Sequence, residues 1–275
     1  MKTTCPICFH HCSLEEGQTG FCGARTNIQD QIICTNYGKI TSIALDPIEK
    51  KPLRRFFPGS FILSAGSYGC NLRCPFCQNS DISQTFKDHV RITMISPQEL
   101  VDEALKLKAR GNIGIAYTYN EPFISYEFVM DCSKLAHQKK LKNVLVTNGT
   151  VEEKPLLDIL PWIDAMNIDL KGFTEAFYKK LSGNLDTVKR TIELSAKSTH
   201  VEITTLIIPD ENDSEKEISQ IAQWIAGIDP EIAYHITRFF PHFRMMDRDA
   251  TEVRLVYHLA EIARQYLPYV YVGNC

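Results

Sequence analysis

The sequence GCNLRCPFCQN, residues 69–79, brings three cysteines close together. Cys70, Cys74 and Cys77 follow the spacing C-x3-C-x2-C, and an aromatic residue, Phe76, stands just before the last of them. Such a trio supplies three thiolates to an iron–sulfur cubane and leaves its fourth iron without a protein ligand. A structural zinc ion normally takes four protein ligands, and this motif offers three. The stretch therefore predicts an iron–sulfur site with one open iron, which can bind a small molecule directly.

Strand-like and helix-like patterns alternate beyond residue 60, as in parallel βαβ units. The expected strands lie at about 61–67, 113–119, 143–149, 165–171, 201–208, 232–239 and 269–273. Capping boxes mark three helix starts: Ser96 with Glu99, Ser214 with Glu217, and Asp249 with Glu252. We therefore expect residues 60–275 to form an α/β fold, a partial (β/α)6 barrel of the TIM type with one possible extra strand.

Residues 1–59 are predicted to form a small cysteine-rich appendage. Cys5, Cys8, Cys12 and Cys22 follow the spacing C-x2-C-x3-C-x9-C, and four thiolates suit either Zn²⁺ or a second iron–sulfur cluster. The sequence leaves this choice open. Alternating apolar residues between 32 and 45 predict a β-hairpin that turns at residues 37–39. We expect the metal to hold the appendage together, because so short a segment buries little apolar surface.

The composition argues against several classes of protein. The 275 residues are 44% hydrophobic and 23% charged, with a formal net charge of −3, so no basic field favours nucleic acid as a partner. No apolar stretch approaches the ~20 residues that span a membrane, and the first residues do not resemble a signal peptide. Ten cysteines in such a chain indicate metal ligation in a reducing cytoplasm.

Short polar motifs follow the predicted strands at their carboxyl ends, where a βα barrel builds its active site. Tyr119-Asn120-Glu121-Pro122 leaves the second strand, Thr-Asn-Gly at 147–149 the third, Asp-Leu-Lys at 169–171 the fourth, and Ile208-Pro209 the fifth. Each motif alone is a weak signal, because Asn-Gly, for example, is usually a turn. Their common position beside the cysteine loop indicates one site.

The cysteine spacing together with these motifs resembles the radical S-adenosylmethionine (SAM) superfamily, and residues 61–240 resemble its pyruvate formate-lyase-activating branch. The resemblance implies a [4Fe–4S] cluster, bound SAM, and reductive cleavage of SAM to methionine and a 5′-deoxyadenosyl radical. It also implies a one-electron donor such as flavodoxin or ferredoxin. The branch has Gly-Gly-Glu-Pro where this chain has Tyr-Asn-Glu-Pro, and Val146 stands where an aspartate often precedes Thr-Asn-Gly.

Candidate site residues carry over from this resemblance. The catalytic set is Cys70, Cys74, Cys77, Asp169 and Lys171. The cofactor-binding set is Phe76, Asn120, Glu121, Thr147, Asn148, Asp169, Lys171 and Ile208. Lys171 is expected to hold an anionic group, since its ammonium is a compact point charge.

The amino-terminal motifs narrow the resemblance to the AmmeMemoRadiSam system radical SAM enzymes. They are the cysteine pattern from Cys5 to Arg25 and the run DPIEKKPL at residues 46–53. Enzymes of this type are associated with partner proteins of the AMMECR and Memo types, so the resemblance implies a protein substrate or partners of that kind.

Two functions remain open at this stage. The first is hydrogen abstraction from a backbone glycine of a partner protein, and the second is radical modification of another macromolecule or metabolite, such as RNA or a small molecule. Arg238 is expected to reach the substrate at the barrel mouth, because it lies near the carboxyl end of its strand. His235 cannot share that face in an alternating strand and is expected in the core.

Overall fold

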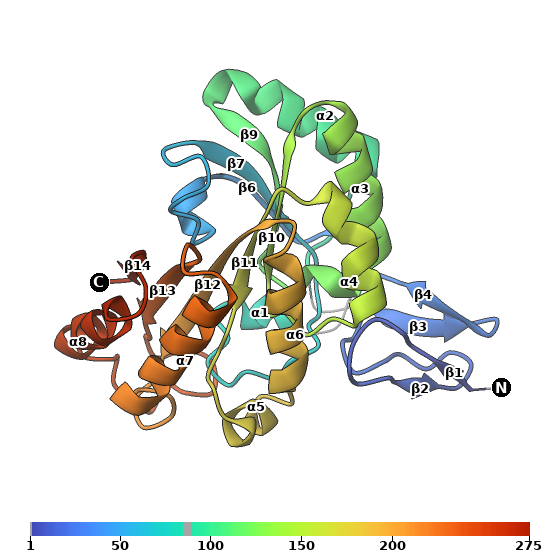
Figure 1. Ribbon diagram of the computed structural model, residues 1–275. Helices are drawn as coiled ribbons and strands as arrows, with labels where there is room; N and C mark the ends of the chain where they lie inside the picture. The colour runs from blue at the N-terminus through green and yellow to red at the C-terminus, as the bar shows by residue number, and fades with distance from the viewer. Residues whose placement is uncertain (1, 85–89) are drawn as a thin grey trace.

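A computed structural model of the protein describes residues 2–84 and 90–275, and its main feature is a single curved sheet of eight strands (Figure 1). The strand order is β14-β13-β12-β11-β10-β9-β7-β6, and every neighbouring pair from β7 to β14 is parallel. The strands are β6 (Ser42–Pro47), β7 (Phe61–Gly66), β9 (Asn112–Tyr117), β10 (Lys142–Thr147), β11 (Ala165–Asp169), β12 (His200–Ile207), β13 (Ala233–Arg238) and β14 (Val270–Gly273). Among the described residues no pairing joins β6 to β14, so the barrel is open. The predicted partial barrel is confirmed.

Helices connect the parallel strands and cover the outer face of the sheet (Figure 1). They are α1 (Ser80–Ser83), α2 (Pro97–Lys106), α3 (Tyr126–Gln138), α4 (Glu153–Ile159), α5 (Glu175–Lys180), α6 (Leu185–Ser195), α7 (Glu215–Ile228) and α8 (Val253–Arg264). Short 3-10 turns η1 (Ile48–Lys50), η3 (Leu107–Arg110), η4 (Pro122–Ser125) and η5 (Leu160–Trp162) complete the connections. The main core lies between the sheet and these helices.

Two of the three predicted helix caps are confirmed. Ser96 and Glu99 form a full capping box, and the Ser214 hydroxyl accepts a hydrogen bond from the Glu217 amide. The prediction for α8 is wrong, because its N-cap is Glu252, whose side chain makes no capping hydrogen bond. Thr251 explains the later start. Its hydroxyl donates to the Ile207 carbonyl at 2.6 Å and so fixes the chain to the sheet just before the helix begins.

The amino-terminal part folds differently from the predicted hairpin. The hairpin is formed by β3 (Arg25–Ile28) and β4 (Gln31–Cys34), and it turns at residues 29–30, both of which have positive φ. Beyond Gly38, β5 (Lys39–Ile40) pairs with β8 (Thr93–Met94). The strand β6 then joins the main sheet antiparallel to β7. A turn is present at residues 35–38, close to the predicted position, but the predicted hairpin around it is wrong, because the strands β4, β5 and β6 pair with three different partners.

The first strands, β1 (Thr3–Thr4) and β2 (Ser13–Leu14), form their own antiparallel pair and project beside the barrel with β3 and β4 (Figure 1). The division at residue 59 remains a prediction, although β6, which precedes it, pairs within the barrel sheet. None of the described helices combines the length and apolarity needed to cross a membrane.

The amino end of the barrel is closed by residues 48–56. Ile48, Leu53 and Phe56 fill the interior there, packed against Ile62, Ala116, Val144 and Ala165. The backbone amides of Arg54 and Arg55 donate to the carboxylate of Glu202, which is fully buried. This closed end leaves the opposite, carboxyl end of the barrel for the site.

Candidate active site

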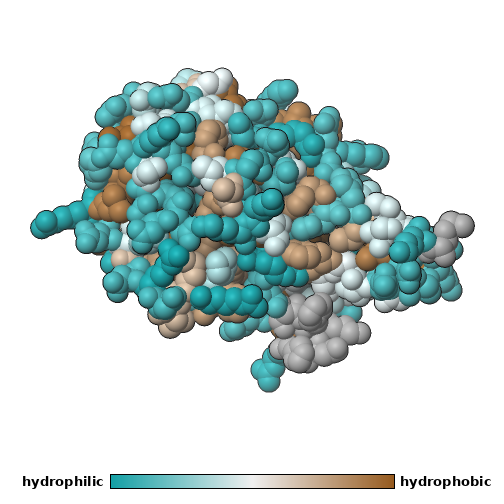
Figure 2. All heavy atoms as spheres, turned by 90° about the horizontal axis from the view of Figure 1, so that it is seen from below, coloured by the Kyte–Doolittle hydropathy of each residue, from teal (hydrophilic) through white to brown (hydrophobic). Residues whose placement is uncertain are grey.

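The three-cysteine loop leaves β7 at the carboxyl end of the barrel. Cys74 is buried, while Cys70 and Cys77 are half-buried. The Leu72 amide lies 3.4 Å and the Asn148 side-chain amide 3.6 Å from the Cys70 sulfur, so both can donate to it. Figure 2 views the molecule from this end and shows apolar side chains in groups near the middle of a mostly hydrophilic face. The loop thus presents its sulfurs at the mouth of the barrel.

Burial makes two of these thiols, those of Cys70 and Cys74, hard to ionise without a metal. The pKa of Cys70 lies well above its usual range because of burial and the nearby charge of Glu121. Burial raises the pKa of Cys74 to about 12, although the ammonium of Lys171 opposes the rise. A bound cation displaces such protons, because thiolates, not thiols, are metal ligands. The donor set therefore fits a cationic cluster, held by three thiolates with amide donors around them.

Glu121 ties the loop after β9 to the loop after β10. Its carboxylate accepts hydrogen bonds from the Thr147 hydroxyl at 2.8 Å, the Asn148 amide at 2.8 Å and the Phe123 amide at 3.0 Å. The side chain is 2% exposed, and burial raises its pKa to about 7 in spite of these donors. Every carboxylate oxygen is already in use, so the predicted contact of Glu121 with SAM remains a prediction.

Asn120 holds the start of the cysteine loop. Its side-chain oxygen accepts from the Ser67 amide at 2.9 Å, and its nitrogen donates to the carbonyls of Tyr68 and Gly69. The sequence assigns this side chain to the cofactor, and its contacts are with the loop that carries the cluster cysteines. Its role in binding SAM stays a prediction.

Asp169 and Lys171 form an ion pair at the same end of the barrel. The Lys171 ammonium lies 2.9 Å from an Asp169 oxygen and 6.0 Å from the centre of the Phe76 ring. Burial alone would lower the pKa of Lys171, but Asp169 and the nearby Cys74 outweigh burial and raise it. Lys171 is therefore a fixed positive charge beside the cysteine loop, as the sequence predicted for an anion partner.

An apolar wall lines the mouth next to this pair. The Phe76 ring stacks on Phe177 with the ring centres 6.4 Å apart. Phe76 and Ile208 belong to one buried cluster with Leu72, Cys74, Leu181, Phe239 and Met245. The structure thus brings all of the sequence-predicted barrel residues to one end of the sheet, although their individual roles remain predictions.

The structure contradicts the expected position of Arg238. Tyr234 and Ile236 pack against the helices, and Arg238 shares their side of β13. Its Nε donates to the Thr251 carbonyl at 2.7 Å, in the segment before α8. His235 instead faces the interior, where its Nε2 lies 2.6 Å from the buried carboxylate of Glu202. The alternation was correct, but nearness to the strand end does not determine which face a residue occupies.

The sequence reasoning missed a polar group inside the barrel. The Asp46 carboxylate accepts hydrogen bonds from Lys51 at 2.8 Å and from the Tyr119 hydroxyl at 2.7 Å. Tyr119 has a φ of 71°, a backbone conformation that glycine adopts far more readily. Two features of the sequence could have indicated this group. A tyrosine stands where the activating branch has glycine, and the run DPIEKKPL contains both an acidic and a basic residue that can pair.

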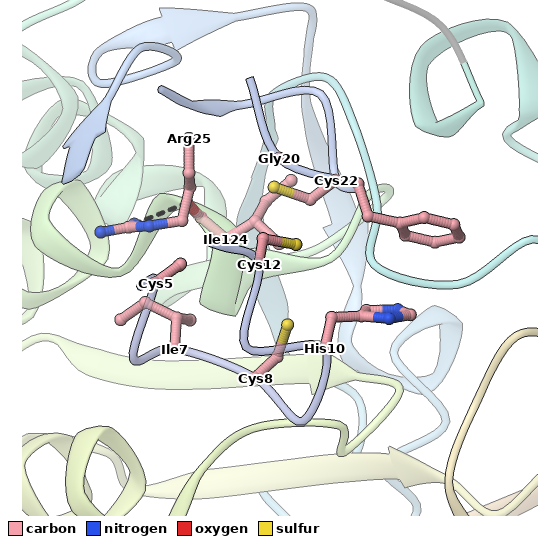
Figure 3. A pocket seen from close by; sticks show the side chains of 10 residues that line it. Cys5, Ile7, Cys8, His10, Cys12, Gly20, Cys22, Arg25 and Ile124 are labelled. Carbon is pink, nitrogen blue, oxygen red and sulfur yellow. Dashed lines mark hydrogen bonds between the residues drawn. The ribbon is translucent and has the colours of Figure 1, made fainter. Parts of the chain in front are cut away.

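The four amino-terminal cysteines line a single cavity. Figure 3 shows the sulfurs of Cys8, Cys12 and Cys22 directed into a shared space, with Arg25 at its edge, and Cys5 is among the lining residues. Burial raises the pKa of Cys8 to about 12 and also raises that of Cys22. The predicted grouping of the four residues is therefore present in the fold, whereas the metal itself stays a proposal.

The comparisons with known proteins agree with this geometry. The family model of the radical SAM superfamily matches residues 65–222, which include the cysteine loop and the motifs after the next four strands. The chain belongs to the radical SAM superfamily. The fold of a radical SAM methyltransferase from Sphaerobacter thermophilus is similar, with a TM-score of 0.61 over 79% of this chain and 67% of that one, at 14% identity.

Radical SAM relatives resemble the chain to different extents. The uncharacterized protein MJ0808 of Methanocaldococcus jannaschii is 38% identical over 99% of this chain and 81% of its own length. The pyruvate formate-lyase 1-activating enzyme of Escherichia coli K12 is 25% identical over 58% of this chain and 68% of its own. The protein is therefore a radical SAM enzyme that resembles the pyruvate formate-lyase-activating enzymes and is only distantly related to them.

Proposed function

We propose that this enzyme removes a hydrogen atom from a partner protein, in the manner of the enzymes that activate glycyl-radical proteins. The observation that carries the proposal is the assembly at one barrel end of the three-cysteine loop, the Asp169–Lys171 pair and the Glu121 network. The "Putative glycyl-radical enzyme activating enzyme MJ1632" of Methanocaldococcus jannaschii supports it, with 27% identity over 73% of this chain and 76% of its own.

The chemistry divides between cofactors and protein. When bound, the [4Fe–4S] cluster on Cys70, Cys74 and Cys77 and its SAM supply a 5′-deoxyadenosyl radical at the cost of one electron from a reduced flavodoxin or ferredoxin. The partner loses a hydrogen atom from a glycine Cα, so that a C–H bond breaks in the partner and one forms in 5′-deoxyadenosine. The unpaired electron stays on the glycine.

The protein's own residues hold this chemistry in place. Lys171 offers a fixed cation to an anionic group such as a carboxylate, and Asp169 orients its ammonium. The wall of Phe76, Phe177 and Ile208 excludes water from the mouth. Glu121, Thr147 and Asn148 join two neighbouring loops and place an amide donor on the Cys70 sulfur. Preorganised groups of this kind need no rearrangement when the reaction occurs.

The same proposal assigns a metal to Cys5, Cys8, Cys12 and Cys22, either zinc or a further iron–sulfur cluster. None of the ten cysteines, all of which lie in the described part of the chain, forms a disulfide, which fits a reducing compartment such as the cytoplasm. The match to MJ0808 includes this segment, since it covers 99% of the chain, whereas the match to the Escherichia coli activating enzyme covers 58%. That difference favours a partner other than pyruvate formate-lyase, and AMMECR- or Memo-type proteins belong to this proposal.

Deuterium transfer tests the proposed substrate class. Cells that make the partner are grown with glycine deuterated at Cα, and their extract is separated into protein, RNA and small-molecule fractions. Each fraction is incubated anaerobically with reconstituted enzyme, SAM and dithionite. We expect deuterium in 5′-deoxyadenosine with the protein fraction alone. Deuterium-free 5′-deoxyadenosine with that fraction, or substrate-dependent turnover with the RNA or small-molecule fraction, would instead support the alternative modification.

A further inference from the structure

One extended segment of the chain separates the two cysteine sites. Residues 69, 71 and 73 of the cysteine loop contact the amino-terminal site. A Cβ atom on Gly69 would lie 2.4 Å from the Cys22 carbonyl oxygen, so the two backbones are in direct contact and φ of Gly69 is +85°. This close approach requires glycine at position 69.

The next two contacts continue along the same side. The Asn71 carbonyl oxygen lies 2.9 Å from His10 Nε2. The guanidinium of Arg73 lies 4.0 Å from the centre of the Phe21 ring and donates to the Phe21 carbonyl. The appendage is therefore attached to the loop at every second residue.

The residues between them belong to the barrel mouth. Leu72 and Cys74 lie in the buried cluster with Phe76, and Cys70 packs against that cluster. The Asn71 side chain also accepts from Asn148 at 2.9 Å, and the same Asn148 amide donates to the Cys70 sulfur. Cys70 thus lies between two residues, Gly69 and Asn71, that contact Cys22 and His10.

The four-cysteine cavity has features of an iron–sulfur site. The sulfurs of Cys8, Cys12 and Cys22 are directed into one shared space, and Cys5 also lines it (Figure 3). Arg25 lines the cavity and is 3% exposed, and its Nε has no hydrogen-bond partner among the described residues although it is buried. A sulfide or thiolate of a cluster would accept from this donor, and hydrogen bonds to sulfur are a recognised way of tuning a cluster.

The position of the cavity favours a cluster over zinc. Four thiolates suit either metal, but a zinc ion has no redox chemistry. The cavity contacts the cysteine loop through Cys22, His10 and Phe21, and the superfamily uses that loop for a redox cluster. A second cluster at this position can exchange an electron with the first, and a zinc ion cannot.

We propose that Cys5, Cys8, Cys12 and Cys22 hold an iron–sulfur cluster that exchanges one electron with the cysteine loop across residues 69–73. The inference rests on the proposed radical SAM function and deepens it by giving the electron a route into the buried mouth. A one-electron donor is oxidised as the amino-terminal cluster is reduced, and that cluster is oxidised again as the cluster that Cys70, Cys74 and Cys77 would hold is reduced. No bond is made or broken and no proton is needed.

Metal content tests the first half of the proposal. The triple variant Cys70→Ala/Cys74→Ala/Cys77→Ala is reconstituted anaerobically with iron and sulfide beside the wild type. We expect about four irons per chain in the variant and about eight in the wild type, with a reduced-cluster EPR signal in both. Zinc without sulfide in the variant, or about four irons in the wild type, overturns the cluster assignment. The iron content of the wild type decides the question by itself, so the test remains decisive even if the variant fails to fold. Neither the iron content nor the EPR signal depends on enzymatic turnover.

Spin coupling tests the second half. The EPR spectrum of the fully reduced wild type is compared with the sum of the spectra of the triple variant and of Cys22→Ser, which keeps the loop cysteines. If the two clusters are coupled across residues 69–73, the wild-type EPR spectrum should be broader than the summed spectra of the two variants. A wild-type spectrum equal to that sum overturns the electronic contact. After removal of the reductant, the wild type should form about two molecules of 5′-deoxyadenosine per chain, against about one in Cys22→Ser. One molecule in each would leave the radical SAM function intact and refute the electron route.

Discussion

Two buried glutamates show how differently the two ends of the barrel are built. Glu202 lies at the closed amino end and accepts four hydrogen bonds, from His200, His235 and the amides of Arg54 and Arg55. Burial raises the pKa of Glu202, but these donors outweigh burial and bring it to about 2. Glu121 lies at the open mouth, accepts three hydrogen bonds, and has a pKa of about 7 because burial dominates.

The difference reflects what each end has to do. Two of the four donors to Glu202 are imidazole groups and two are backbone amides, and together these hydrogen bonds favour its charged form. Glu121 has neutral donors and lies near Asp169, whose negative charge disfavours its ionised form. The closed end therefore holds the barrel together, whereas at the mouth Glu121 lies close to a change of protonation.

Replacing the loop cysteines should have the largest effect of any change in the molecule. Alanine at Cys70, Cys74 or Cys77 removes a ligand that no other residue of the loop can supply. We expect SAM cleavage under dithionite to fall to background, measured as 5′-deoxyadenosine by chromatography. Cys132→Ala is the matched control, because Cys132 is fully buried in α3, away from both cysteine sites. Cleavage at the wild-type rate in a loop variant would refute the assignment.

Glu202→Gln should destabilise the fold at neutral pH and spare SAM cleavage. The folded pKa of about 2 lies below the ordinary value of 4.5, so Glu202 stabilises the fold above pH 4.5, and this is lost as the pH falls through 2. The shift corresponds to roughly 3 kcal/mol. Urea unfolding of the variant and the wild type at pH 6 measures the loss in the free energy of unfolding, and the same experiment at pH 3 should give a smaller loss. Glu193→Gln, at an exposed position, is the control. An equal difference between variant and wild type at both pH values would contradict the proposed role.

Glu121→Gln should show the opposite dependence on pH. The folded pKa of about 7 lies above the ordinary value of 4.5, so the contribution of Glu121 is fully present below pH 4.5 and is lost as the pH rises through 7. Relative to the wild type, the free energy of unfolding of the variant should rise by up to roughly 3 kcal/mol between pH 5 and pH 8. The rise is reduced because the glutamine amide accepts fewer hydrogen bonds than the carboxylate. If the free energies of unfolding of the variants at positions 121 and 202, relative to the wild type, changed with pH in the same direction, the contrast between the two ends would be refuted.

The sequence could predict the parts of this architecture that depend on local patterns. All seven expected strands are present, because alternation and turn residues act within a few positions. The partner of β6 was predicted wrongly, since alternating residues look alike whether they pair with a hairpin partner or with the free edge of β7. The face occupied by Arg238 was wrong for a related reason, because it depends on which side of the sheet the helices cover.

The contacts that shape the site could not be predicted, because they join distant parts of the chain. The Tyr119 hydroxyl meets Asp46, 73 positions earlier, and the Asn71 side chain meets Asn148, 77 positions later. Motif positions indicated which residues gather at the mouth. They could not show that Asn120 and Glu121 use their side chains on neighbouring loops, which only the fold reveals.

Lys171→Met should have the smallest of these effects and tests the mouth most directly. Methionine keeps an unbranched apolar stem but removes the charge that Asp169 fixes beside the Cys74 sulfur. We expect about tenfold weaker SAM cleavage, ~1.4 kcal/mol, expressed chiefly in the KM for SAM, with iron content unchanged. Lys180→Met is the control, since its ammonium lies 2.6 Å from Glu211 on an exposed surface. If iron were lost in proportion to activity, Lys171 would support the cysteine loop and would not hold an anionic group. The ion pair at the mouth would then have a structural role, like the Glu202 network at the closed end.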